Sequence, residues 1–180
     1  MVKEPRPSRV KTRLGRDFGM IPAAWWFRHQ TRTLIRRLRD PRWHIILAVS
    51  PDREGLQSRV WPEDIPRLPQ GPGTLGDRMA RMLRSTAGPT LVIGADIPGI
   101  TRPHIARAFH ALAQNASTIG PAPDGGYWCV GLRHPRRAPT TLFQNVRWST
   151  KHALKDTAKT LPTPIATIDT LRDIDTAADL

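Results

Sequence analysis

The sequence is poor in cysteine, in long apolar runs and in acidic residues near its beginning. Cys129 is the only cysteine, so the chain has neither an internal disulfide nor a zinc site built from several cysteines. The longest apolar runs, at 45–49 and 91–93, have the length of a strand, whereas a membrane helix needs about 18 apolar residues. No apolar signal-peptide core stands near the first residue, so we expect a cytoplasmic protein without a membrane span.

The sequence is strongly basic: it has 28 Lys and Arg and 15 Asp and Glu, which give a net charge of +13. The excess concentrates in residues 1–40, which hold eleven basic residues and three acidic ones. Such a segment attracts polyanions, namely nucleic acid, a membrane surface or nucleotide phosphates. For residues 28–39 a solvated, arginine-rich face is the alternative interpretation.

Apolar strand-length runs alternate with segments of helical periodicity, which predicts a single α/β domain over residues 1–180. Helices are expected at 20–39, 75–84, 102–114 and 149–161, and strands at 44–49, 90–95, 117–120, 127–132 and 165–168. Residues 3–16 and the proline-rich segment 51–74 are expected to be irregular. A doubly wound domain should open with a buried strand, and only two residues precede Lys3, so this strand is expected to be truncated or to lie upstream.

Residues 3–14 form a basic segment whose prolines favour an extended loop. An arginine guanidinium can donate two hydrogen bonds to the oxygens of one phosphate, and a lysine ammonium adds a compact positive charge. The segment therefore suits a triphosphate or a pyrophosphate leaving group. A disordered basic tail is the alternative. The cations are Lys3, Arg6, Arg9, Lys11 and Arg13.

Asp96 directly follows the apolar run 90–95. Ligands of open α/β sheets bind at the carboxyl ends of strands, where a carboxylate is both accessible and firmly held. Aspartate oxygens suit Mg²⁺ or Mn²⁺, and these metals in turn bridge phosphates. The alternative is that Asp96 caps the next turn.

The Asp124-Gly125-Gly126 triplet is a turn signal that precedes the expected strand at Tyr127. Paired glycines also let a backbone approach a ligand closely. A plain hairpin turn explains the triplet equally well. At the end of the chain, Asp173, Asp175 and Asp179 supply either a second metal carboxylate or a helix cap.

Residues 71–76 match the G-x-G-x-x-G pattern of dinucleotide-binding folds, with Asp96 twenty residues further on. That site requires a strand directly before the first glycine. Pro66 and Pro69 precede Gly71, so no strand is expected there and NAD binding is not favoured. The glycine-rich loop instead enters the helix at 75–84, whose first turn could meet an anion.

Taken together and in this order, these segments resemble a bacterial family of glycosyltransferase-A-like proteins, domain of unknown function 2064. The matching stretches are Lys3-x-Pro5-x-Pro7-x-Arg9-Val10-Lys11-Thr12-Arg13-Leu14, Gln70-Gly71-x-Gly73-x-Leu75-Gly76-x-Arg78-Met79, Gly94-x-Asp96-Ile97-Pro98-Gly99, Gly120-Pro121-Ala122-x-Asp124-Gly125-Gly126-Tyr127, Trp148-Ser149-Thr150 and Asp173-Ile174-Asp175-Thr176-x-x-Asp179-Leu180. The family is similar to molybdenum-cofactor and phospholactate guanylyltransferases.

The resemblance implies a three-layer, Rossmann-like nucleotide-diphospho-sugar transferase fold with a mostly parallel central sheet. It implies that Asp96 is the principal metal carboxylate, with Asp175 as a second ligand, and that Lys11 and Arg13 contact nucleotide phosphates. Asp124, Gly125 and Gly126 would line the acceptor or sugar side. The other expected substrate contacts are Lys3, Arg9, Gly71, Gly73, Arg78 and Tyr127. Ser8 stands where the family usually has glycine, and Thr74 where it usually has an acidic residue.

We therefore expect a transferase that uses Mg²⁺ or Mn²⁺, an NTP or a nucleotide sugar, and a small acceptor bearing a phosphate or hydroxyl. Nucleotidyl transfer is preferred because five cations suit a triphosphate better than a sugar diphosphate. Glycosyl transfer is the close alternative. A nucleic-acid-binding module based on residues 1–40 and a non-catalytic relative that only binds nucleotides are two further alternatives.

Overall fold

The computed structural model describes residues 1–174 and shows two compact units that alternate along the chain. The first unit comprises residues 1–71, 95–102 and 173–174, and the second comprises residues 72–94 and 103–172. Each unit has its own sheet and is described by itself, and the single domain expected over the whole chain stays a prediction. No helix in the described range combines the length and the apolar character that crossing a membrane requires.

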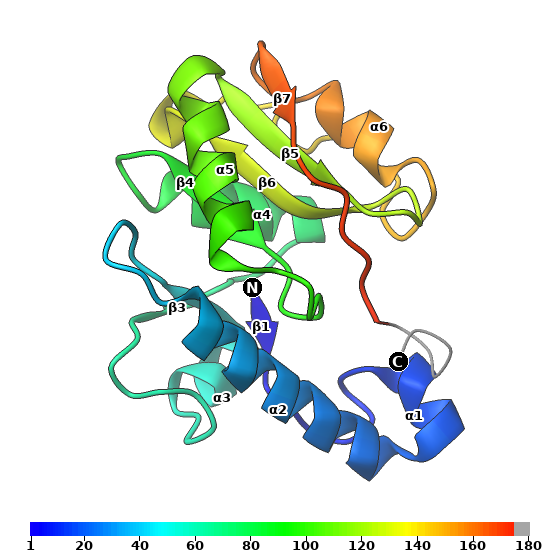
Figure 1. Ribbon diagram of the computed structural model, residues 1–180. Helices are drawn as coiled ribbons and strands as arrows, with labels where there is room; N and C mark the ends of the chain where they lie inside the picture. The colour runs from blue at the N-terminus through cyan, green and yellow to red at the C-terminus, as the bar shows by residue number, and fades with distance from the viewer. Residues whose placement is uncertain (175–180) are drawn as a thin grey trace. The chain divides into compact units, whose positions relative to one another are not determined.

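The first unit is organised by a parallel sheet of three strands in the order β1-β2-β3. Its strands are β1 (Val2–Lys3), β2 (Leu47–Ser50) and β3 (Arg67–Pro69), and its helices are α1 (Thr12–Phe18), α2 (Met20–Leu38) and α3 (Asp52–Leu56). The first three residues of β2, the central strand, are buried, as expected for a strand paired on both sides. Figure 1 shows α1 and α2 in blue, meeting at a sharp corner.

The apolar face of α2 explains why this segment is helical and where it packs. Phe27, Leu34, Ile35 and Leu38 recur at helical spacing, and all four are buried. Phe27 and Ile35 join a core cluster that includes Val49 of β2. Most arginines of α2 are left partly or fully exposed, whereas Thr31 is buried with the apolar face.

The second unit contains a mixed sheet in the order β4-β6-β5-β7. Its strands are β4 (Thr90–Ile93), β5 (Ser117–Pro121), β6 (Tyr127–Leu132) and β7 (Ile165–Thr167), and its helices are α4 (Leu75–Arg84), α5 (Arg102–Gln114) and α6 (Ala153–Ala158), with a 3₁₀ turn η1 at Pro135–Arg137. β6 is antiparallel to both of its neighbours, whereas β5 and β7 run parallel. On β6, Gly131 leaves room for Leu112 of α5, which packs against the sheet there. Across the two units, three of the five described strand pairs are parallel, which confirms the predicted α/β class with mostly parallel pairing.

Several elements differ from the sequence-based expectation, and one of them is α6, which is shorter than the helix expected at 149–161. The helix α1 lies partly inside the expected loop at 3–16, and α3 and β3 lie inside the segment 51–74 that was expected to be irregular. β3 contains Pro69 because it is an edge strand, where a missing N–H donor is tolerated. The opening strand is present as β1, whose two residues are too few to produce an alternating pattern.

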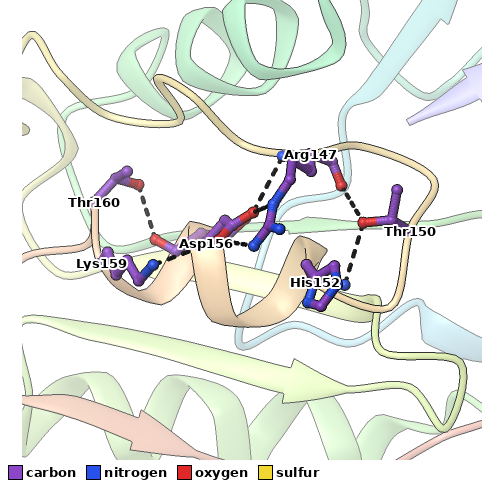
Figure 2. A network of polar contacts seen from close by, with 7 residues as sticks. Arg147, Thr150, His152, Asp156, Lys159 and Thr160 are labelled. Atoms are coloured by element: carbon purple, nitrogen blue, oxygen red, sulfur yellow. Dashed lines mark hydrogen bonds and ion pairs between the residues drawn. The ribbon is translucent and has the colours of Figure 1, made fainter.

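A polar network in the second unit holds the segment that carries Trp148-Ser149-Thr150 (Figure 2). Asp156 of α6 is buried and accepts two hydrogen bonds from the Arg147 guanidinium, at 2.7 and 3.0 Å. Lys159 adds an ion pair at 3.6 Å. The Thr150 hydroxyl donates to the Arg147 carbonyl and accepts from the His152 N–H. The network therefore pins a loop of irregular backbone onto the start of α6.

Asp156→Asn should destabilise the protein at neutral pH and much less in acid. The hydrogen bonds from Arg147 hold the pKa of Asp156 well below its ordinary value, so its contribution is present above an unfolded pKa of about 3.9. That contribution is lost as the pH falls through the lower folded pKa. Urea unfolding of the parent and of Asp156→Asn, from pH 7 downward, measures the difference in their free energies of unfolding. Glu63→Gln, at an exposed position, is the control. A difference in unfolding free energy that stayed constant into acid would contradict a stabilising role for the ionised Asp156.

Candidate functional site

Three segments leave the carboxyl edge of the parallel sheet in the first unit, which is where open α/β sheets bind ligands. They follow β1, β2 and β3 and are tied together by hydrogen bonds. The Glu4 N–H donates to the Ser50 carbonyl at 2.8 Å, and the Gly71 N–H donates to the Asp52 carboxylate at 3.1 Å. Residues from the basic segment and from the Gln70-Gly71 motif therefore share one edge of the sheet.

Gln70 has a structural task at this edge. Its side-chain amide is buried and donates to the carbonyls of Val2 and Ala48, at 3.2 and 2.8 Å. Its own N–H donates to the Val49 carbonyl. One side chain thus bridges β1 and β2, and it holds the short strand β1 in register.

Lys11 and Asp96 meet in the first unit. The Lys11 ammonium lies 3.2 Å from Asp96 Oδ2 and donates to the Ile174 carbonyl at 2.6 Å. Its side chain is 5% exposed, whereas that of Asp96 is 39% exposed. The Ile174 N–H in turn donates to the Asp96 carbonyl at 3.4 Å. The arrangement places a buried positive charge behind a carboxylate that solvent and ligands can reach.

Two other cations of the basic segment contact an acidic residue of α3. Arg6 and Arg9 both pair with Glu54, at 3.3 and 3.5 Å. Lys3 is exposed at the end of β1, and Arg13 is exposed on α1. Lys11 therefore pairs with one carboxylate, and Arg6 and Arg9 pair with another.

The loop that carries Asp96 is held by α2. The Arg37 guanidinium donates to the carbonyls of Pro98 and Ile100, and the fully buried Thr31 hydroxyl lies 3.5 Å from the Ala95 carbonyl. Sequence reasoning missed these two positioning residues. Arg37 belongs to a run of arginines in which nothing distinguishes it, and a threonine on a helix gives no signal of its own.

The Gly71–Arg78 motif folds back on itself. Gly71 and Gly73 have positive φ angles of 75° and 102°, a conformation that glycine adopts most easily. Thr74 and Asp77 form a reciprocal capping box at the start of α4, and Arg78 donates to the Gly73 carbonyl at 3.1 Å. Thr74, which stands where an acidic residue is usual, therefore caps this helix itself.

The absence of a strand before Gly71 was also predicted, and this prediction is wrong, because β3 ends at Pro69. A dinucleotide site is nevertheless disfavoured. The Asp77 carboxylate accepts the Thr74 N–H at 2.8 Å, so an acidic group already occupies the first turn of α4, where a pyrophosphate would have to sit.

The Asp124–Tyr127 turn is closely packed within the second unit. Asp124 accepts from the Gly126 N–H at 2.9 Å, and Gly125 has a φ of 85° with its Cα facing the Lys151 backbone. The Tyr127 hydroxyl accepts from Thr157 at 3.3 Å, and burial raises the pKa of the Tyr127 phenol. These residues, together with Gly71, Gly73, Arg78, Lys3 and Arg9, stay predicted substrate contacts.

The second unit also contains an open groove of about 1160 Å³. It is lined by both ends of the irregular loop before α6 and by the start of α4. Gly73, Thr74 and Trp148, all from the motifs singled out in the sequence, are among its lining residues. The groove therefore brings two motifs together that are more than seventy residues apart in the sequence.

Asp96 is the predicted metal ligand that lies within the described residues. Mg²⁺ is commonly bound through one or two carboxylates together with substrate phosphates, and Asp96 offers one exposed carboxylate. Within residues 1–174 no group of three or more His, Cys, Asp or Glu gathers as a metal site. Asp175, the second predicted ligand, lies outside the described residues, as does Asp179. A metal at Asp96 would therefore depend on the substrate for much of its coordination.

The model of one protein family matches residues 33–150, about two thirds of the chain. Its description is an uncharacterised protein conserved in bacteria, DUF2064. The chain belongs to the DUF2064 family. No curated protein matches this DUF2064 member, so the family model confirms the relationship without assigning a reaction.

Two solved structures place this DUF2064 member among known folds. One, from Desulfovibrio desulfuricans G20, is assigned provisionally to the nucleotide-diphospho-sugar transferases; it is 26% identical, with a TM-score of 0.84, and the match covers 97% of this chain and 80% of that one. The other is 4-diphosphocytidyl-2C-methyl-D-erythritol synthase from Anaerococcus prevotii DSM 20548, 12% identical with a TM-score of 0.57, over 85% and 82% of the two chains. The predicted nucleotide-diphospho-sugar transferase fold is thereby confirmed.

Gly125→Ala should destabilise this DUF2064 member by roughly 3 kcal/mol, because it combines a left-handed backbone with a backbone clash. An added Cβ would lie 2.4 Å from the Lys151 carbonyl oxygen, and backbone cannot move aside as a side chain can. Gly88→Ala is the matched control, since nothing lies within 4 Å of its added Cβ. Urea denaturation measures both. Equal stability of the two variants would show that the turn adapts freely.

Ser8→Gly should stabilise the protein by about 0.5 kcal/mol, net of the greater freedom of glycine in the unfolded chain. Ser8 has a φ of 64°, in the left-handed region, at the position where the resemblance leads us to expect glycine. Ser8→Val should have the opposite effect, because branched side chains tolerate this region poorly. Thermal melts of the three proteins test the order, and a less stable glycine variant would contradict it.

Proposed function

We propose that this protein is a metal-dependent transferase that uses a nucleoside triphosphate or a nucleotide sugar, with nucleotidyl transfer preferred. The observation that carries the proposal is the buried Lys11 ammonium beside the exposed Asp96 carboxylate. A fixed positive charge next to a hard oxygen ligand is the combination that phosphate chemistry needs. The similarity to the D. desulfuricans structure supports the same class of enzyme.

In nucleotidyl transfer, an acceptor oxygen attacks the α-phosphorus, the bond from that phosphorus to the bridging oxygen breaks, and pyrophosphate leaves. Lys11 orients Asp96 through its hydrogen bond and adds a fixed positive charge close to the reacting phosphates. Arg13, exposed on α1, stabilises the departing pyrophosphate. Asp96 would hold Mg²⁺ or Mn²⁺, which when bound neutralises charge on the phosphate oxygens.

Glycosyl transfer is the second candidate. In that reaction the bond between the anomeric carbon and the diphosphate oxygen breaks, and a nucleoside diphosphate leaves. The D. desulfuricans neighbour favours it by its assignment to the nucleotide-diphospho-sugar transferases. The number of cations in residues 3–14 favours nucleotidyl transfer, because a triphosphate is more highly charged than a sugar diphosphate.

Thermal-shift measurements with NTPs and nucleotide sugars, each with and without Mg²⁺ or Mn²⁺, test the proposal. At about a hundred times the dissociation constant, a bound nucleotide should add about 2.7 kcal/mol of stability. This gain should require metal and should disappear in Asp96→Asn. Asp64→Asn, which removes an exposed aspartate paired with Arg39, is the matched control and should keep the full gain.

Asp96→Asn also leaves the Lys11 ammonium without its anion, so the folded state of the variant is checked first by circular dichroism. The double variant Lys11→Met/Asp96→Asn removes both charges and separates lost binding from lost stability. Pyrophosphate release from a triphosphate would identify nucleotidyl transfer, and nucleoside diphosphate release from a nucleotide sugar would identify glycosyl transfer. A nucleotide-dependent gain that survives in Asp96→Asn would refute the assignment of the site.

A further inference from the structure

An apolar patch is exposed where α1 meets α2. Phe18 ends α1, and Ile21, Pro22 and Trp25 lie in the first two turns of α2. Phe18 is 52% exposed, Ile21 67% and Trp25 61%, and these are the three most exposed large apolar residues of the described chain. Apolar side chains gathered in this way on a surface indicate a contact surface and are not needed for the fold.

The same face of α2 becomes cationic further along the helix. At 3.6 residues per turn, Ile21, Trp25, Arg32 and Arg36 fall within an arc of about 60°. Arg32 and Arg36 are exposed. Between residues 12 and 38 the sequence contains six arginines and a single acidic residue, Asp17. The helix therefore presents one continuous stripe that is apolar at its beginning and positive at its end.

An anionic lipid surface matches both halves of this stripe. Helices that lie in a membrane interface bury Trp, Phe and aliphatic side chains at the level of the headgroups. Basic residues beside them are attracted to anionic lipids, and this attraction weakens as salt screens it.

Two other occupants fit the stripe less well. Nucleic acid would use the arginines and could stack on Trp25, but Ile21 and Pro22 offer no ring on which a base can stack. A second copy of the chain could bury the apolar half, but it would bring together two helices that carry no acidic residue. Anionic lipid alone complements the aliphatic residues and the arginines together.

We propose that the stripe on α1 and α2 is a docking surface for anionic membranes. Phe18, Ile21 and Trp25 enter the headgroup region, and Arg32 and Arg36 bind lipid phosphates. The surface is peripheral, and it is consistent with the absence of a membrane-spanning helix from the described residues. It does not depend on the proposed reaction, because none of these residues has a role at Asp96.

Co-sedimentation with vesicles tests this surface. The full chain is mixed with vesicles of phosphatidylcholine alone, or with vesicles of phosphatidylcholine and phosphatidylglycerol in equal parts. The protein should bind the anionic vesicles at least about tenfold more tightly, and raised salt should weaken this binding. Ile21→Ser/Trp25→Ser and Arg32→Gln/Arg36→Gln should each lower the affinity by about tenfold.

Matched controls lie on other surfaces of the same unit. Leu56→Ser removes an exposed apolar side chain from α3, and Arg53→Gln/Arg59→Gln removes one exposed arginine of α3 and another that follows the helix. Both control variants should bind anionic vesicles as the unchanged protein does. All the substituted side chains are exposed, so the variants should keep the circular dichroism spectrum and melting temperature of the parent.

Several outcomes would overturn the proposal. Equal affinity for neutral and anionic vesicles, or equal loss in the control variants, would remove the role of the stripe. Sedimentation velocity without lipid would identify a protein interface if it showed dimers that Ile21→Ser/Trp25→Ser dissociates. Tight binding to single-stranded DNA that needs Trp25 and Arg32, without vesicle binding, would identify a nucleic-acid surface.

Discussion

A buried positive charge is the constraint on which the first unit depends. The Lys11 ammonium is nearly inaccessible to water, so its hydrogen bonds must come from the protein. They come from Asp96, 85 residues away in the sequence, and from the Ile174 carbonyl, 163 residues away. Three distant segments must therefore meet before this charge is satisfied. Lys11 itself has a left-handed backbone with a φ of 46°, which shows how closely the surrounding structure determines its position.

Elements with a regular set of buried apolar residues could be predicted from the sequence, and elements without one could not. The helices α4 and α5 and the strand β6 begin and end where their patterns predicted. The strands β1 and β3 have two and three residues, which is too few to establish a period, and the only buried residues of α1 are Leu14 and Gly15. Their structure depends on tertiary contacts such as the two hydrogen bonds from Gln70, which no local pattern reveals.

The pairings among the predicted site residues could not be inferred from the sequence. Gly125 and Gly126 were interpreted as room for a ligand or as a plain hairpin turn, and Gly125 faces the Lys151 backbone. A sequence shows where glycines stand, but it does not show whether protein atoms or a ligand occupy the space beside them. In the same way, the positive charge of residues 3–14 is evident from the sequence, but its ion pairs are not. Lys11 pairs with Asp96, whereas Arg6 and Arg9 pair with Glu54.

Glu54 gives the two exposed arginines of the basic segment an anion before any ligand arrives. A phosphate that bound Arg6 and Arg9 would meet this carboxylate at short range and would be repelled by it. A polyphosphate has more charge to offer the two arginines, so it would offset that repulsion better than a weakly charged molecule. The carboxylate of Glu54 would thereby bias these arginines toward ligands of high charge density.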